Sequence, residues 1–343
     1  MSDFAVLGGP GLVRTWVEEL LKRAKTATKR KVNFLAVDFK SEPVNDIAEN
    51  ADRLWLVREP ATWLAARIAA GSIRTVVALE DPLDAFAFSR TYKGTLLEAV
   101  RDQSAATAAT LILADNPAVL FVVRWTEVPA RHVATQMLLH LGFVVTEPAL
   151  LAVVDTLAGT AQQALSLESV LAARGGKYTP QRRSTIDFSE DAEAAAASLA
   201  LDPFVAKLTG GDLAPIVWPV DLLLDGDDFV RPARRICDLT GPARNLVRGP
   251  YLCLPPGRYA CRYIMRFLRD GADTRYALEI HGKRLLQRQL FTPPVEGTFA
   301  LECDLDIDAP DHWIDLRFRL EEGAIGGEVA VERAELQWQG PPQ

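Results

Sequence analysis

The clearest chemical potential in this chain of 343 residues lies near its start, in the segment 4–21. An apolar run, Phe4–Leu7, is followed by a glycine turn, and a helical pattern begins directly after it at Leu12. Such an arrangement points backbone N–H groups and the positive end of a helix dipole at one place, where an anion such as phosphate can bind. The turn therefore predicts an anion- or nucleotide-binding site. Its candidate residues are Gly9, Pro10, Gly11, Arg14, Thr15 and Trp16.

The turn matches neither of the two common nucleotide-binding patterns in full. A Walker A loop ends in Gly-Lys followed by Ser or Thr, whereas this turn has Arg14-Thr15 and no lysine, which excludes an ordinary ATPase or kinase. A dinucleotide fingerprint is met at Gly9 and Gly11 but has Arg14 at its third glycine. Asp38 stands about where a ribose-binding acid belongs, so a dinucleotide- or nucleotide-sugar-dependent enzyme stays an alternative. A turn that only allows close packing of helix and sheet is another.

Apolar runs alternate with helical patterns over residues 1 to about 150. Continuous apolar runs are typical of parallel strands that are buried on both faces. This alternation predicts a doubly wound parallel sheet with right-handed crossovers, a fold of the α/β class. The expected strands are Phe4–Leu7, Val32–Phe39, Leu54–Val57, Thr75–Leu79 and Val119–Arg124, and the expected helices are Leu12–Ala24, Ala61–Ala70, Leu83–Ser89, Gly94–Leu113 and Ala130–Leu141. Further helices are expected over 150–174.

From about residue 213 onward the hydrophobic period changes to two, which predicts an all-β segment. Eight short strands in a row favour an antiparallel β-sandwich of the jelly-roll type. They are Val217–Leu224, Leu246–Leu254, Arg258–Leu268, Thr274–Ile280, Arg284–Phe291, Thr298–Ile307, Trp313–Leu320 and Glu328–Trp338. We thus expect an α/β domain over 1–174, a linker with an alanine-rich helix capped by Ser189 over 175–212, and the sandwich over 213–343.

The segment Gly9–Trp16 resembles the 5′-phosphosulfate loop of sulfotransferases, in which Pro-Lys-Ser-Gly-Thr-Thr-Trp joins a strand to a helix. Pro10, Thr15 and Trp16 fall in register with that motif, while Gly11 replaces its lysine. The resemblance covers about 150 residues, including Asn116–Glu127 and Met137–Phe143. It implies a P-loop-like sulfotransferase fold and, if the protein is active, 3′-phosphoadenosine 5′-phosphosulfate as cofactor.

A second sulfotransferase signature, Arg-x-Pro-x-Asp followed by a helical serine, has its counterpart after the strand Thr75–Leu79. Pro82 and Asp84 are in place and Ser89 follows, but Glu80 stands where the family has the arginine for the 3′-phosphate. Loss of the loop lysine removes the charge that stabilises a transferred sulfuryl group. The resemblance therefore implies altered or lost activity, with an active sulfotransferase acting on a glycan hydroxyl as the alternative. No catalytic residue is assigned.

The expected sandwich carries aromatic residues whose flat rings could stack on sugars. The glycan-binding candidates are Trp218, Tyr251 and Trp313. The segment Gly249–Tyr259 resembles the opening of carbohydrate-binding-like sandwiches attached to bacterial glycan enzymes. Together the two resemblances imply an accessory or modifying protein of bacterial surface-polysaccharide metabolism, a pseudoenzyme that binds a glycan or a protein partner through its sandwich.

The bulk composition limits the classes of partner. Net charge is −7, from 38 Lys and Arg against 45 Asp and Glu, which argues against nucleic-acid binding. No apolar run approaches the length of a transmembrane helix and no signal peptide is recognised, so a cytoplasmic location is expected. The four cysteines form no C-x-x-C pair, and buried thiols are expected rather than a metal site. The oligomeric state is left open.

Overall fold

The computed structural model describes residues 3–9, 11–37, 52–57, 62–114, 116–124, 127–158, 165–173, 191–208, 211–309 and 313–342. The chain divides into two compact units. The first, the α/β unit, comprises Met1–Lys93 and Ile112–Thr185, and the second, the sandwich unit, comprises Gly94–Leu111 and Ile186–Gln343. The domain boundaries predicted at 174 and 212 stay a prediction. The division into units adds that residues 94–111 fold with the second unit.

The α/β unit is built on one sheet of five parallel strands in the order β2-β3-β1-β4-β5. The strands are β1 Asp3–Leu7, β2 Val32–Val37, β3 Asp52–Val57, β4 Arg74–Leu79 and β5 Val119–Val123. All five lie where the apolar runs of the sequence predicted them, and their parallel pairing confirms the α/β fold class. The hydrophobic runs form strands here because a parallel sheet between two helical layers leaves neither face to water.

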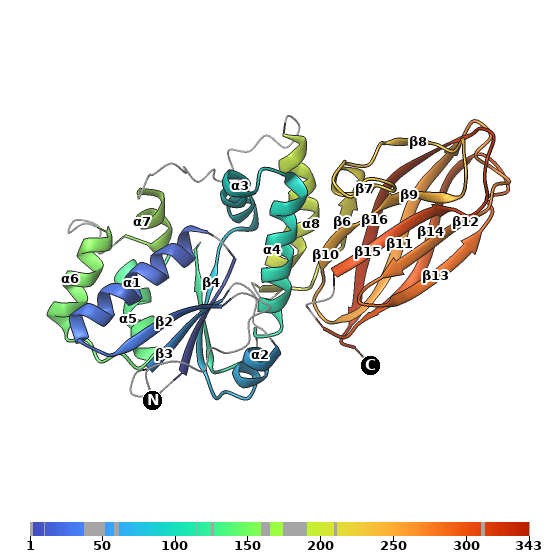
Figure 1. Ribbon diagram of the computed structural model, residues 1–343. Coiled ribbons are helices and arrows are strands. Elements are labelled where there is room, and N and C mark those ends of the chain that lie inside the picture. The colour runs from blue at the N-terminus through green and yellow to red at the C-terminus, as the bar shows by residue number, and fades with distance from the viewer. Residues whose placement is uncertain are drawn as a thin grey trace. The chain divides into compact units, whose positions relative to one another are not determined.

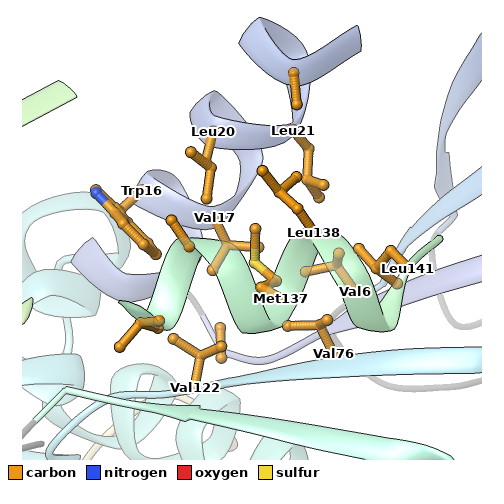
Figure 2. Close-up of a cluster of buried hydrophobic side chains, with 14 of the residues drawn as sticks. Val6, Trp16, Val17, Leu20, Leu21, Val76, Val122, Met137, Leu138 and Leu141 are labelled. Atoms are coloured by element: carbon orange, nitrogen blue, oxygen red, sulfur yellow. The ribbon is translucent and has the colours of Figure 1, made fainter. Parts of the chain in front are cut away.

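Helices cover both faces of this sheet (Figure 1). They are α1 Leu12–Thr28, α2 Thr62–Ala69, α3 Pro82–Lys93, α5 Ala130–His140, α6 Glu147–Ala158 and α7 Leu167–Ala173. Helices α1, α5, α6 and α7 share one core with the strands, and Figure 2 shows Trp16, Val17 and Leu20 of α1 packed toward Met137 and Leu138 of α5. On the opposite face the ring of Trp63 in α2 meets Trp55 of β3 edge-on at 5.1 Å.

The strand order places a topological switch point between β1 and β4. The chain leaves β1 toward β2 on one side of the sheet, whereas it leaves β4 toward β5 on the other. In open α/β sheets a crevice forms at the carboxyl ends of two such strands, and ligands bind there. The glycine turn after β1 and the residue Glu80 after β4 therefore meet at the position where this fold class places its sites.

The sandwich unit contains two antiparallel sheets that form a jelly-roll-type β-sandwich, as the period-two pattern predicted. One sheet has the order β13-β12-β15-β9-β7 with β10 paired to β15, and the other has β14-β11-β16-β6 with β8 paired to β16. The strands are β6 Ile216–Pro219, β7 Leu224–Asp225, β8 Ile236–Asp238, β9 Arg244–Arg248, β10 Pro250–Cys253, β11 Gly257–Leu268, β12 Tyr276–His281, β13 Leu285–Phe291, β14 Gly297–Ile307, β15 Trp313–Leu320 and β16 Glu328–Gly340.

Two strand predictions in this unit need correction. The single strand expected over Leu246–Leu254 is divided into β9 and β10 at Gly249, whose φ of 94° is a left-handed conformation that interrupts the extended chain. The expected strand Val217–Leu224 is likewise interrupted by a short 3₁₀ turn at Val220–Leu222. The alanine-rich helix α8 runs over Ala192–Leu208 and begins with a hydrogen bond from Ala194 N–H to Asp191 Oδ1. Ser189 lies outside the described residues.

Helix α4, Leu96–Leu111, packs with the sandwich rather than with the sheet whose sequence surrounds it. Its small residues Ala105 and Ala108 form a buried cluster with Cys253 of β10. Two polar contacts fix the same junction, because Ser104 Oγ accepts from Cys253 N–H at 3.3 Å and Arg101 Nε donates to the Pro250 carbonyl at 2.8 Å. Close approach of helix and strand requires the short alanine side chains at these positions.

Within the described residues, no helix combines the length and the apolar character needed to cross a bilayer.

Candidate functional site

The turn between β1 and α1 is shaped by two glycines that allow close contacts with β4 and its end. A Cβ at Gly8, whose φ is 144°, would lie 2.4 Å from the Ala78 carbonyl oxygen. A Cβ at Gly11 would lie 2.7 Å from Glu80 Oε2. Gly11 is the N-cap residue of α1, and as a glycine it has no side chain that could cap the helix. The space that a side chain would take there is filled by the carboxylate of Glu80.

Glu80 acts as the cap of α1 from across the switch point. Its Oε2 accepts a hydrogen bond from Val13 N–H at 2.9 Å, and Leu12 N–H contributes a further hydrogen bond to the same carboxylate. These are the first N–H groups of the helix, which have no partner within the helix itself. A carboxylate at this end is also favoured by the helix dipole. The anion position predicted from the sequence is therefore occupied by an anionic group of the protein's own chain.

Arg124, directly after β5, joins Glu80 to Asp84 of α3 in a buried charge cluster. Its Nη1 donates to Glu80 Oε1 at 2.8 Å and also contacts Asp84 Oδ2. The side chains of the three residues are only 5%, 8% and 7% exposed, respectively. Asp81 and Pro82 position Asp84, because Asp81 Oδ1 accepts from Leu83 N–H at 2.9 Å and so caps the helix in which proline is the first residue.

Burial shifts both carboxyl groups of this cluster toward the neutral form. The pKa of Glu80 is raised by desolvation, an effect that Arg124 and the N–H groups of α1 oppose. Desolvation likewise raises the pKa of Asp84 to about 7, against the attraction of Arg124 and with smaller repulsion from Asp81 and Glu80. One guanidinium thus serves two carboxyl groups, and the folded state holds the proton on Asp84 more tightly than the unfolded chain does.

A pH dependence of stability follows from the raised pKa of Asp84. Between its unfolded value of 3.8 and its folded value of about 7, the native state binds more protons than the unfolded state. The stabilisation is complete below the lower value and is lost as pH rises through the upper one, with a slope of at most about 1.4 kcal/mol per pH unit. We expect the urea unfolding free energy to fall from pH 5 to pH 8 and the fall to be shallower in Asp84→Asn. Equal slopes would contradict this assignment.

The residues predicted from the glycine turn are mostly engaged in contacts of their own. Arg14 donates from Nε to Glu18 at 2.8 Å and from Nη1 to the Gly8 carbonyl at 2.8 Å. The Thr15 hydroxyl donates to the Gly11 carbonyl at 2.9 Å. Trp16 is buried in the core between α1 and α5, so its ring does not line the turn.

Two of the remaining candidates of this site, Gly9 and Ser89, fall within the described residues. Gly9 lies half-buried in the turn itself. Ser89 is buried on α3. Pro10 and Asp38, and with Asp38 the ribose contact of the dinucleotide alternative, lie outside the described residues.

The three aromatic candidates of the sandwich unit occupy different environments. Trp218 on β6 is 1% exposed and belongs to the core. Trp313 at the start of β15 is 59% exposed and, by the alternation of the strand, shares its face with Asp315 and Arg317. Tyr251 on β10 is half-buried and has a φ of 64°. Of these three candidates, Trp313 is therefore the one whose ring is presented to solvent.

Tyr251 is surrounded by arginines rather than by open space. The guanidinium carbon of Arg101 lies 4.8 Å from the centre of its ring, and that of Arg248 lies 5.5 Å from it. Arg248 and Arg317 both bond Asp315, at 3.2 Å and 2.6 Å. The Asp315 carboxylate also accepts from the Gly249 N–H at 2.8 Å, so these charged groups hold the turn between β9 and β10 to β15.

Solved structures of a sulfotransferase and of carbohydrate-binding modules are similar to this chain. Mouse sulfotransferase SULT7A1, solved in complex with PAP, matches 61% of this chain and 85% of its own at 10% identity, with a TM-score of 0.38. TmCBM61 in complex with β-1,4-galactotriose matches 36% of this chain and 88% of its own at 10% identity, with a TM-score of 0.25. The CBM36-1 domain of a xylanase from the hindgut metagenome of Trinervitermes trinervoides matches 37% and 99% at 10% identity, with a TM-score of 0.27.

The resemblances found in the sequence name the same two kinds of protein. No family model and no curated protein matches the chain.

The cofactor that the sulfotransferase resemblance implies does not fit the residues present at the turn. Glu80 takes the N–H groups of α1 that would bind the 5′-phosphosulfate, and its negative charge would repel that group. Arg14, the cation nearest in sequence, is directed to Glu18 and to the backbone.

Sequence reasoning missed the role of Glu80 as a cap and did not identify Arg124 as its partner. The available signal was the presence of opposite charges directly after the adjacent parallel strands β4 and β5.

Proposed function

We propose that this protein is an accessory glycan-binding protein of bacterial surface-polysaccharide metabolism, in which a sulfotransferase-like α/β unit no longer transfers a sulfuryl group. The observation that carries the proposal is the hydrogen bond from Val13 N–H to the Glu80 carboxylate. A helix N-terminus that is already neutralised by a buried carboxylate offers an incoming phosphosulfate no net attraction.

The chemistry of sulfuryl transfer supports this reading. Charge that develops on the transferred group needs hydrogen-bond donors and cations that are already in place, and removing one such group costs about 3–4 kcal/mol, or a few hundredfold in rate. At this turn the family lysine is replaced by Gly11, and the buried cation Arg124 is held between Glu80 and Asp84. An active enzyme would have to break that cluster before it could bind its cofactor.

The sandwich unit supplies the binding function. Trp313 presents an exposed indole at the start of β15, and the partly exposed Arg317 lies on the same face of the strand and offers its guanidinium as a hydrogen-bond donor. A flat apolar ring flanked by hydrogen-bonding groups suits the face of a pyranose, whose C–H groups stack on the ring while its hydroxyls bond to the neighbours. Trp218 contributes to the core and is not part of this surface.

One ligand screen by thermal shift tests both halves of the proposal. We expect oligosaccharides of bacterial surface polysaccharides to raise the melting temperature by binding the folded state, and 3′-phosphoadenosine 5′-phosphate to leave it unchanged. Trp313→Ala should weaken oligosaccharide binding about tenfold or more, the effect of losing roughly 1.4 kcal/mol of stacking. The matched variant Ile325→Ala, which shortens a fully exposed apolar side chain, should bind as the native chain does.

The two halves can fail separately. A saturable shift with the nucleotide would contradict the loss of the cofactor site and favour an active sulfotransferase. Equal oligosaccharide binding by native protein and Trp313→Ala would contradict the role of the β15 face. A shift with NAD alone would favour the dinucleotide-dependent enzyme.

A further inference from the structure

Two of the four cysteines face each other across neighbouring strands of the sandwich. The antiparallel register of β11 and β14 pairs Cys261 with Cys303 directly. Directly opposed residues of such a pair have Cα atoms about 4.5–5.5 Å apart and side chains on the same face of the sheet. A disulfide needs Cα atoms about 4.4–6.8 Å apart. The backbone of this sheet therefore already meets the spacing of a disulfide.

The two sulfur atoms are in contact but their surroundings differ. Cys261, on a strand paired on both sides, is completely buried, whereas Cys303 lies on the edge strand β14 and is half-buried. A hydrogen bond from the Cys261 thiol to the Cys303 sulfur lowers the pKa of Cys303, and the same hydrogen bond, with burial, raises the pKa of Cys261. One thiol is thus both more accessible and more readily ionised than its partner, which is the asymmetry of an attacking and a resolving cysteine.

The other two cysteines have no cysteine opposite them in their strands. Cys237 on β8 pairs with Val329, and Cys253 on β10 pairs with Trp313. Both are buried, and burial raises the pKa of the Cys237 thiol to about 11, where the reactive thiolate is scarce at neutral pH. They serve as internal references for the reactivity of the facing pair.

We propose that Cys261 and Cys303 form a reversible redox pair, which a small disulfide such as oxidised glutathione converts into a disulfide that joins β11 to β14. The Cys303 thiolate attacks one sulfur of the oxidant, forming a mixed disulfide and releasing one glutathione thiolate. The Cys261 sulfur, on losing its proton, then attacks the Cys303 sulfur, and the second glutathione leaves as a thiolate. The pair gives up two electrons and two protons, which reduce the oxidant to two glutathione thiols.

The bond would act on the edge of the sheet. Among the described strands, β14 is paired with β11 and forms one end of its sheet order, so its outer hydrogen-bonding groups are open to local fraying. A covalent link at the middle of the β11–β14 pair would couple opening of this edge to opening of the more central strand β11. Amide hydrogen exchange in β14 should therefore slow in the oxidised form and recover on reduction.

Thiol titration of the full-length protein after treatment with oxidised glutathione tests the proposal. After denaturation under non-reducing conditions, the native chain should retain two of its four thiols. Peptide mapping should find a single linked pair, the segments that contain Cys261 and Cys303. Cys237→Ser should again lose two thiols, and Cys303→Ser should form no internal disulfide. Dithiothreitol should restore the full number in each case.

Retention of all four thiols at oxidant concentrations that oxidise a thioredoxin control would overturn the proposal. So would a linked peptide that contains Cys237 or Cys253, or an internal disulfide in Cys303→Ser. The linked peptide is measured on the native chain, so this result does not depend on whether a variant folds.

Discussion

Replacing Arg124 with methionine is expected to destabilise the α/β unit by about 3–5 kcal/mol at neutral pH. The guanidinium lies between the carboxylates of Glu80 and Asp84, and all three side chains are almost completely removed from water. Methionine fills much of the same volume but leaves two buried carboxyl groups without their shared cation. The expected loss in unfolding free energy comes from buried charge that has no partner. It greatly exceeds the net free energy by which the original ion pairs stabilise the fold.

The loss of stability in the α/β unit is measured by urea unfolding, with amide hydrogen exchange in β1 and β4 as the probe. The loss of unfolding free energy in Arg124→Met should become smaller as pH is lowered, because Glu80 and Asp84 can then take up protons and lose their charge. The control is Arg131→Met, which removes an exposed ion pair with Glu147 on the same unit and should cost at most about 1 kcal/mol. Equal losses in the two variants, or a deficit that does not depend on pH, would show that the buried cluster has no special role.

The sequence allowed the α/β sheet to be predicted because each of its strands is a continuous apolar run. Runs such as Phe4–Leu7 and Thr75–Leu79 have no polar face, and only a sheet covered on both sides can bury them. The glycine turn was interpretable for a similar local reason, since an apolar run, the glycines and a helical pattern follow one another directly in the sequence. These features depend on neighbouring residues only.

The function of Glu80 could not be predicted in the same way because it depends on contacts between distant segments. The residue that caps α1 is 67 positions away from Val13, and the cation that neutralises it is 44 positions further along the chain. The sequence showed an acid where the sulfotransferase resemblance implies an arginine, from which repulsion of a phosphate follows. That the same carboxylate would take the place of the anion follows only from the strand order β1-β4-β5.

The membership of α4 in the sandwich unit was also beyond sequence analysis. Its pattern is that of a helix rich in alanine between two strands of a parallel sheet, and such a helix normally covers the sheet beside it. Alanines at positions 105 and 108 are small enough to let a helix approach a strand closely, but they carry no information about which strand that is. The partner, β10, lies about 150 residues later in the chain, as the 149 positions between Ser104 and Cys253 show.

A glutamate at position 108 is expected to detach α4 from β10 and to destabilise the sandwich unit by more than about 3 kcal/mol. Ala108 is completely buried against Cys253, and the neighbouring Ser104 bonds the Cys253 backbone. Ala108→Glu would place a larger, charged side chain at a position that is completely removed from solvent. Such a change combines overpacking with the desolvation of an ion, two of the mechanisms that give the largest losses in stability.

The reactivity of Cys253 provides a direct measurement of this detachment. In the native chain the thiol is 1% exposed, so it should react slowly with an aromatic disulfide reagent, whereas in Ala108→Glu it should be modified rapidly before global unfolding. The same substitution at Ala192, an exposed position at the start of α8, is the control and should leave both stability and thiol reactivity unchanged. If Ala108→Glu lowered the unfolding free energy while Cys253 stayed protected, the loss would have to arise elsewhere. The assignment of α4 to β10 as a structural support of the sandwich would then be wrong.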